Sequence, residues 1–211
     1  MKNFGQAYQS IGGCCLIIAG FTTAVALSFH PSKFIPGSVL SDLWSPVHLA
    51  LLLAFTLSAI GMVGIYSFLK DEANLFNCIA YIIGIVGSIW SVAIVIIEVF
   101  VLADLPTDSA MEMPLMDIRF LGTTLNKMQV FFYTAVFCWL WGWTMTGFAL
   151  VKSPKLPPYI GYIMICACTG IAVMTIFTGG ASQMLHIVFS LFFGISWVLL
   201  GNTILKYGHV Y

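Results

Sequence analysis

Charged side chains are scarce in this chain: Lys, Arg, Asp and Glu make up 8% of its 211 residues, whereas apolar residues make up 60%. A soluble domain carries roughly 25% charged residues, so this chain cannot cover a globular surface with charge. Its net charge is zero, which gives no basis for a nucleic-acid partner. With a mean hydropathy of +1.01, the composition predicts a polytopic membrane protein without a soluble domain.

Motifs that carry chemistry are lacking as well. The sequence has no glycine-rich phosphate loop, no zinc-ribbon spacing and no nucleophile motif. Its six cysteines lie within or at the ends of apolar runs, where cysteine usually acts as a small hydrophobe. Cys166 and Cys168 are too close for a redox C-x-x-C pair, and in a helix their side chains diverge by about 200°. We therefore expect neither exposed disulfides nor a thiol redox site.

Long apolar runs are what the chain has in abundance. A spanning helix needs about 20 apolar residues, and six runs reach that length: 11–30, 46–69, 77–102, 128–151, 158–178 and 184–206. Ala24-Val25-Ala26 resembles a signal-peptide cleavage site, but the run is long and only Lys2 precedes it, so we expect a retained helix. The predicted fold class is all-α: residues 1–211 form one six-transmembrane-helix bundle.

The longest connection, 103–127, is predicted to be an external loop. It holds four of the eight acidic residues. Its apolar residues between 111 and 121 are too many for a free loop, so we expect it to lie over the bundle and to form a short amphipathic helix on the membrane surface.

Lysine in the short loops predicts the orientation. The N-terminus, the 70–76 loop, the 152–157 loop and the C-terminus share one side of a six-helix protein, and they hold five of the eight basic residues. We therefore expect a multi-pass protein of the cell membrane with both termini cytoplasmic.

A faint internal repeat accompanies this topology. The second, fourth and sixth runs each start with polar residues and end with glycine followed by lysine, as at Gly64 and Lys70, Gly147 and Lys152, and Gly201 and Lys206. Three duplicated helical hairpins would explain the pattern. The alternative is that every inward-running helix ends in lysine for reasons of charge alone.

Three segments carry a resemblance: WSPVHLALLLAFTLSAIGMVGIY at 44–66, IEVFV at 97–101 and GFALVKSPKLPPYIGYIMICACTG at 147–170. Together they resemble a family of six-helix bacterial membrane proteins defined by a domain of unknown function. The matching motifs are a Pro-x-His opening the second helix, an acidic residue before an aromatic in the third, and Leu-Pro-x-x-x-Gly entering the fifth: Pro46 and His48, Glu98 and Phe100, and Leu156, Pro157 and Gly161. The resemblance implies the six-helix fold and a bacterial inner membrane, but no activity.

Ionisable residues within the runs share one depth. At 1.5 Å per residue, Glu98 lies some 6–8 Å below the outer end of the third run, and His48 and His186 lie near the outer starts of the second and sixth. A lone charge at this depth is costly and usually faces the bundle interior. We therefore predict that Glu98 lies within reach of His48, His186 or Arg119 of the external loop, and that these four residues form a ligand-binding site.

Tryptophan is concentrated in the fourth run. At 100° per residue, Trp139 and Trp143 share a face and Trp141 opposes them, so we expect one of these faces to meet lipid or a partner subunit.

Four functions remain open at this point. The first is a non-enzymatic protein that binds a small ligand or lipid in an outer-leaflet pocket, or serves as an accessory subunit of a larger membrane complex. The second is a redox protein with b-type haem between His48 and His186. The third is a small transporter, which at this length would need to dimerise. The fourth is a metal-dependent hydrolase with zinc on His48, His186 and Glu98. The cofactor, the metal and the oligomeric state are not specified by the sequence.

Overall fold

The computed structural model describes residues 2–31, 40–100, 127–177 and 183–208. This part of the chain is all-helical, as predicted: six α-helices and one 3-10 turn follow one another as α1 (Lys2–Ser28), α2 (Trp44–Leu69), η2 (Lys70–Glu72), α3 (Leu75–Phe100), α5 (Lys127–Lys152), α6 (Pro158–Phe177) and α7 (Gln183–Tyr207). Five of these helices are long and apolar enough to cross a membrane. In the remaining helix, α6, the described stretch Pro158–Met174 is shorter but also apolar.

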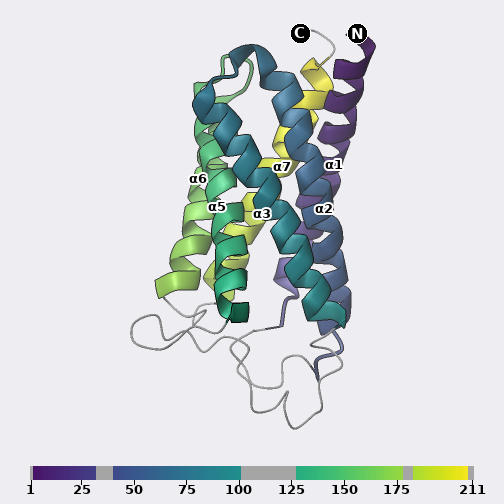
Figure 1. Cartoon of the computed structure of the whole chain (residues 1–211), viewed down its shortest axis with the longest axis vertical. Coiled ribbons are helices and arrows are strands. Elements are labelled where there is room, and N and C mark those ends of the chain that lie inside the picture. The colour runs from purple at the N-terminus through teal and green to yellow at the C-terminus, as the bar shows by residue number, and fades with distance from the viewer. Residues whose placement is uncertain (1, 32–39, 101–126, 178–182, 209–211) are drawn as a thin grey trace.

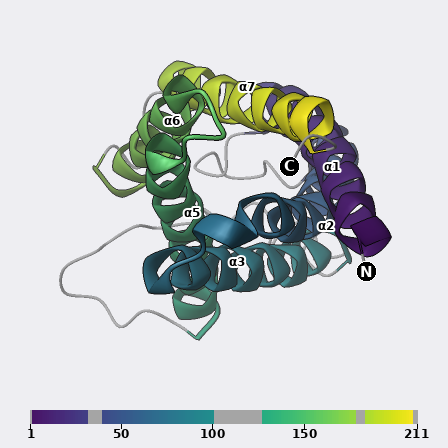
Figure 2. The same cartoon turned by 90° about the horizontal axis from the view of Figure 1, so that it is seen from above.

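The helices form a closed ring (Figures 1 and 2). Each helix packs against its neighbours in sequence, and α7 closes the ring by packing along α1. The start of α1 and the end of α7 lie at the same end of the bundle (Figure 1). We call the opposite end, where α1 and α3 end and α2 and α7 begin, the distal end. The ring contains the three consecutive hairpins expected from the sequence, and their duplication stays a prediction.

Glycine allows the helices to approach closely at the seams of the ring. A Cβ atom on Gly64 of α2 would lie 2.6 Å from the Cα atom of Gly12 in α1, and one on Gly20 of α1 would lie 2.5 Å from the carbonyl oxygen of Gly194 in α7. Glycine also meets glycine between α3 and α5 and between α5 and α6. Because lipid tails are as apolar as the helices, such close packing is a main source of helix association in membranes.

Aromatic side chains fill the interior of the ring midway along its length. Trp139 and Trp143 of α5 contact Phe193 and Trp197 of α7, with ring centroids 4.7–6.1 Å apart. We call these four residues the tryptophan cluster. All four are buried, whereas Trp141, on the opposite face of α5, is exposed. The predicted division of the two faces is therefore present, with the Trp139–Trp143 face turned inward.

The sequence-based boundaries agree with the helices except at the start of α1, which begins at Lys2 rather than near residue 11. Polar bonds to α2 hold this extra length: the Gln9 side-chain amide donates to the Ser67 carbonyl oxygen at 3.1 Å, and the Ser67 hydroxyl donates to the Gly5 carbonyl oxygen at 3.2 Å. A hydropathy pattern does not register such bonds. Residues 101–126 lie outside the described part of the chain, and so does almost all of the predicted 103–127 loop with its amphipathic helix.

Candidate functional site

Glu98 meets His48 at the distal end of the bundle. The Oε2 atom of Glu98, near the end of α3, lies 3.4 Å from the Nε2 atom of His48, one turn into α2. The His48 side chain is completely buried, and that of Glu98 is 9% exposed. The predicted contact between Glu98 and a histidine is therefore present, and it joins two neighbouring helices of the ring.

Trp44 holds both members of this pair in place. Its indole N–H donates to the backbone carbonyl oxygen of Glu98 at 2.9 Å, and its ring stacks on the imidazole of His48 with centroids 4.1 Å apart. The Trp44 carbonyl oxygen lies 2.7 Å from Nδ1 of His48. Because residues four apart lie on one face of a helix, the first turn of α2 presents Trp44 and His48 together to α3.

The hydrogen bond to Trp44 fixes the tautomer of His48. A carbonyl oxygen can only accept, so Nδ1 carries a hydrogen and donates it. In the neutral ring, Nε2 then has a lone pair and no hydrogen. Its approach to a carboxylate is attractive only if one proton lies between them, as imidazolium with carboxylate or as imidazole with carboxylic acid. Either arrangement is neutral overall, which lowers the cost of burying Glu98 in an apolar bundle.

His30 extends this group toward the surface. It follows the last turn of α1, is half-buried, and its ring lies 4.8 Å from that of His48 and 6.3 Å from that of Trp44. Its Nδ1 donates to the Pro31 carbonyl oxygen at 2.6 Å. We call His30, Trp44, His48 and Glu98 the acid–base cluster. It brings together three ionisable side chains, from the residues directly after α1, from α2 and from α3.

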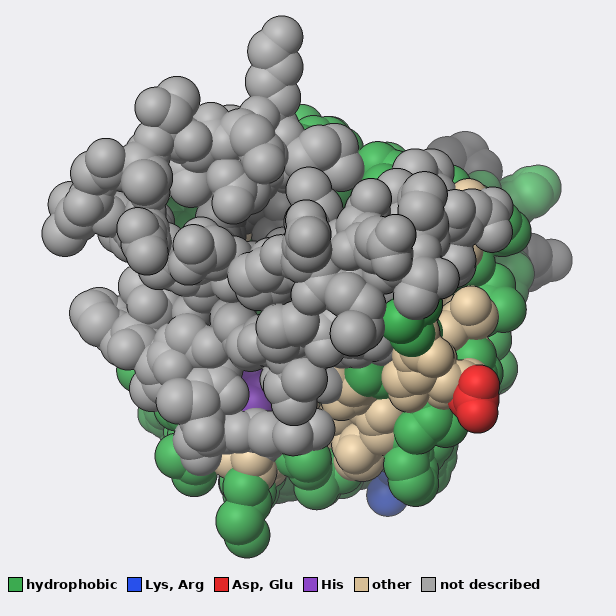
Figure 3. Space-filling view, turned by 90° about the horizontal axis from the view of Figure 1, so that it is seen from below, with side chains coloured by type: hydrophobic (Ala, Val, Ile, Leu, Met, Phe, Trp, Pro, Cys, Tyr) green, Lys and Arg blue, Asp and Glu red, His purple; other side chains and the backbone are tan. Residues whose placement is uncertain are grey.

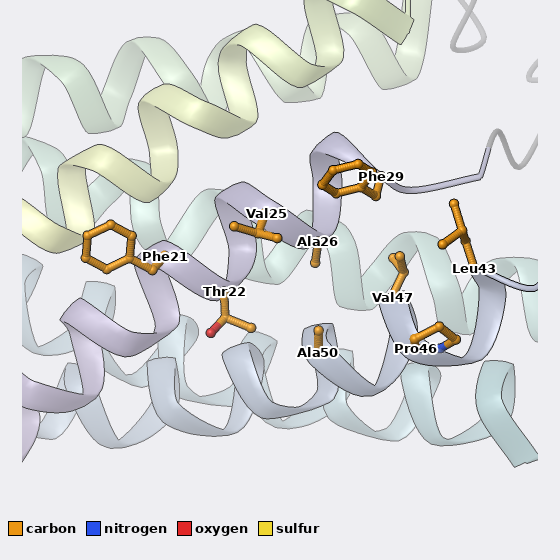
Figure 4. Close-up of a pocket in the computed structure, with 9 residues that line it drawn as sticks. All are labelled: Phe21, Thr22, Val25, Ala26, Phe29, Leu43, Pro46, Val47 and Ala50. Atoms are coloured by element: carbon orange, nitrogen blue, oxygen red, sulfur yellow. The ribbon is translucent and has the colours of Figure 1, made fainter.

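An apolar groove runs beside the cluster, between α1 and α2 on the outside of the ring (Figure 4). The groove is open and has a volume of about 430 Å³. All of its lining residues except Thr22 are apolar: Phe21, Val25, Ala26 and Phe29 in or directly after α1, and Leu43, Pro46, Val47 and Ala50 at the start of α2. Phe21, Val25 and Phe29 are exposed, while Ala26 and Val47 form a buried floor. Figure 3 shows the distal end in space-filling form, with apolar side chains over much of its described surface and a histidine visible.

The other two predicted site residues are His186 and Arg119. His186 lies in the first turn of α7 and is half-buried. Arg119 lies outside the described residues. Among the described residues there is no group of three or more His, Cys, Asp or Glu side chains that could hold a metal ion. This part of the chain therefore does not assemble the zinc site considered from His48, His186 and Glu98.

The surroundings of His48 do not suit an axial haem ligand either. Haem iron binds an imidazole nitrogen through its lone pair and needs open space for the porphyrin beyond it. In His48, Nδ1 donates to Trp44 and Nε2 faces Glu98 at 3.4 Å. Both nitrogen atoms are engaged, so the haem hypothesis with His48 and His186 gains no support.

Sequence reasoning missed Trp44 and His30 as members of the cluster. The spacing of four between Trp44 and His48 was a usable signal, because it places both on one helical face. His30 lies at the same depth as His48. However, the turn that brings its ring onto that of His48 follows the end of α1, and hydropathy does not reveal such a turn.

No family model, curated protein or solved structure matches the chain. The family resemblance noted from its motifs therefore stays a prediction.

Proposed function

We propose that this protein is a non-enzymatic integral membrane protein that binds a lipid or lipid-like amphiphile in the outer leaflet of the cell membrane. With both termini cytoplasmic, as the lysine distribution indicates, the distal end lies in the outer leaflet. The polar head of the ligand contacts the acid–base cluster, and its apolar chain lies in the groove between α1 and α2.

The proposal rests on one observation: groove and cluster are built from adjacent residues on both helices. Directly after α1, Phe29 lines the groove and the next residue, His30, belongs to the cluster. In α2, Val47 lines the groove and the next residue, His48, belongs to the cluster. An amphiphile with its chain in the groove therefore has its polar end next to His30, the half-buried member of the cluster.

The energetics of the pair favour a functional role over a purely structural one. A buried ion pair is often no more stabilising than apolar side chains of similar volume, and elsewhere in this bundle apolar and glycine contacts pack the helices together beside a few hydrogen bonds. Ionisable residues inside a membrane generally mark ligand or ion sites. Burying Glu98 and His48 thus costs free energy that apolar packing between the two helices would not cost.

Native mass spectrometry of the protein released from mild detergent tests the proposal. We expect the wild type to retain a lipid-sized molecule, and Glu98→Gln to lose it, because an amide cannot share a proton with His48 in the same way. Ala50→Trp should also lose it by filling the groove. Ala59→Trp is the matched control, since Ala59 is half-buried on the same helix but does not line the groove. Equal retention by all four proteins would contradict the proposal.

A further inference from the structure

Three indole N–H groups in the tryptophan cluster have no hydrogen-bond partner. They are the Nε1 atoms of Trp139, Trp143 and Trp197, all buried in the described part of the bundle. Trp139 and Trp143 are 6% and 0% exposed, and Trp197 is 0% exposed. Their rings meet across the interior of the ring of helices, with Trp197 lying 4.7 Å from Trp143 and 6.1 Å from Trp139 between centroids.

The same chain satisfies a buried indole elsewhere. Trp44 is 1% exposed, and its N–H donates to the Glu98 carbonyl oxygen at 2.9 Å. Buried polar groups in proteins are nearly always paired, and an unpaired one loses its interaction with water without replacement. A buried serine or threonine can turn its hydroxyl to a carbonyl of its own helix, but an indole N–H has no such local acceptor. Three unpaired indoles in one cluster therefore indicate an acceptor supplied from outside the chain.

The chemistry of the cluster restricts that acceptor. An indole N–H only donates, so the three indoles offer hydrogen-bond donors and no acceptors. A water molecule typically makes about three hydrogen bonds in a buried site, and its own two hydrogens would need acceptors that the indoles cannot provide. A carbonyl oxygen accepts without having to donate. An anion also accepts, but the buried residues of the described part of the chain include no lysine or arginine that could neutralise it.

We propose that the interior of the ring, between α5 and α7, binds a neutral, largely apolar molecule through a carbonyl oxygen, such as that of a ketone, an ester or a quinone-type ring. The indoles of Trp139, Trp143 and Trp197 donate to its oxygen atoms, and Phe193 packs against its apolar body. The site is distinct from the acid–base cluster: at 1.5 Å per residue, the three tryptophans lie about 18–24 Å along their helices from the distal end. It does not depend on the proposed function.

Indole N–H resonances of the ¹⁵N-labelled protein in bilayer nanodiscs test this proposal, since hydrogen bonding to an oxygen moves the proton resonance downfield. The chain contains both references. Trp44 is bonded to a carbonyl oxygen, and Trp141 is 51% exposed on the outer face of α5. Single Trp→Phe substitutions assign the signals. The protein is first stripped of organic molecules by exhaustive detergent exchange, and a long-chain methyl ketone is then added. The matched control is the alkane of the same chain length.

We expect the ketone, but not the alkane, to move at least two of the three cluster resonances downfield, toward the position of Trp44. The resonance of Trp141 should not move. Three results would each overturn the proposal. One is the absence of any difference between ketone and alkane. Another is resonances upfield of Trp141 throughout, which would show that the indoles donate to aromatic faces. The last is downfield resonances in the stripped protein with exchange to water, which would show that water is the acceptor.

Discussion

At the scale of single residues, the bundle tolerates Glu98 because its carboxyl group is not alone. Trp44 binds the backbone of Glu98 and the side chain of His48, and His48 contacts the Glu98 carboxyl group. Since Nδ1 of His48 is tied to a carbonyl oxygen, the remaining nitrogen can interact favourably with Glu98 only by sharing a proton. The pair is then neutral, which is the form that an apolar environment favours.

This account predicts different outcomes for two substitutions at Glu98. In Glu98→Gln, the amide can donate to Nε2 of His48, so unfolding free energy should fall by less than about 1 kcal/mol while ligand binding is lost. In Glu98→Leu, the buried Nε2 atom loses that interaction, and unfolding free energy should fall by about 1–3 kcal/mol. Unfolding by denaturant in mixed micelles measures both. Equal stability of the Gln and Leu variants would show that the carboxyl group does not interact with His48.

A partner for Glu98 among His48, His186 and Arg119 could be predicted from the sequence, whereas the choice of His48 could not. Helical rise fixes depth, so residues near corresponding helix ends were expected at one level. The sequence does not specify how each helix is rotated about its own axis. These helices are apolar on all sides, so periodicity does not identify an inner face. Hence His186 had the same standing as His48 in the sequence, and Trp44 could have been found only from its spacing of four from His48.

At the scale of helices, the ring depends on glycine at the seams. The α1–α2 seam brings the Cα atoms of Gly12 and Gly64 so close that a Cβ atom on either has no room, because backbone and not a flexible side chain occupies the space. This seam matters for the proposed site, since the groove and His30 lie farther along the same two helices. Separation of α1 from α2 would widen the groove and remove His30 from His48.

We predict that Gly64→Ala lowers the unfolding free energy by about 1–3 kcal/mol, the usual range for inserting a methyl group into a packed interface. Gly5→Ala is the control: it lies in α1, and the nearest atom to its added Cβ would be Nζ of Lys70 at 4.0 Å. Both substitutions improve helix propensity equally, so that contribution cancels in the comparison. Thermal unfolding of the two variants side by side provides the measurement. If Gly64→Ala is as stable as Gly5→Ala, the close seam does not exist.

At the scale of the whole molecule, the ring places the start of α1, the end of α7 and the short lysine-bearing loops at one end and the acid–base cluster at the other. The helix boundaries, except the start of α1, followed from the apolar runs, because a bilayer of fixed thickness demands about 20 residues per crossing. The order of helices around the ring agrees with short connections between neighbours. The hydropathy pattern did not predict the packing of α7 against α1, because glycine contacts such as that of Gly20 with Gly194 make this interface.

The orientation is tested by accessibility of single cysteines introduced into a cysteine-free variant. With both termini cytoplasmic, Cys at position 42 (Asp42→Cys) should react with an impermeant maleimide in intact cells, and Cys at position 73 (Ala73→Cys) should react only after the membrane is opened. Both positions are exposed at opposite ends of the bundle. The reverse labelling pattern would place the acid–base cluster in the inner leaflet and invert the proposed orientation.

The contact between Glu98 and His48 can be measured most directly by solid-state NMR of the protein in bilayers, with ¹⁵N-labelled histidine and ¹³C-labelled glutamate. The account predicts a His48 ring protonated at Nδ1, and a through-space correlation between its Nε2 atom and the Glu98 carboxyl carbon. That correlation should vanish in His48→Phe. A Glu98 carboxyl carbon that correlates with lipid headgroups and not with His48 would contradict the account, because the proposed ligand site would then have no buried pair at its centre.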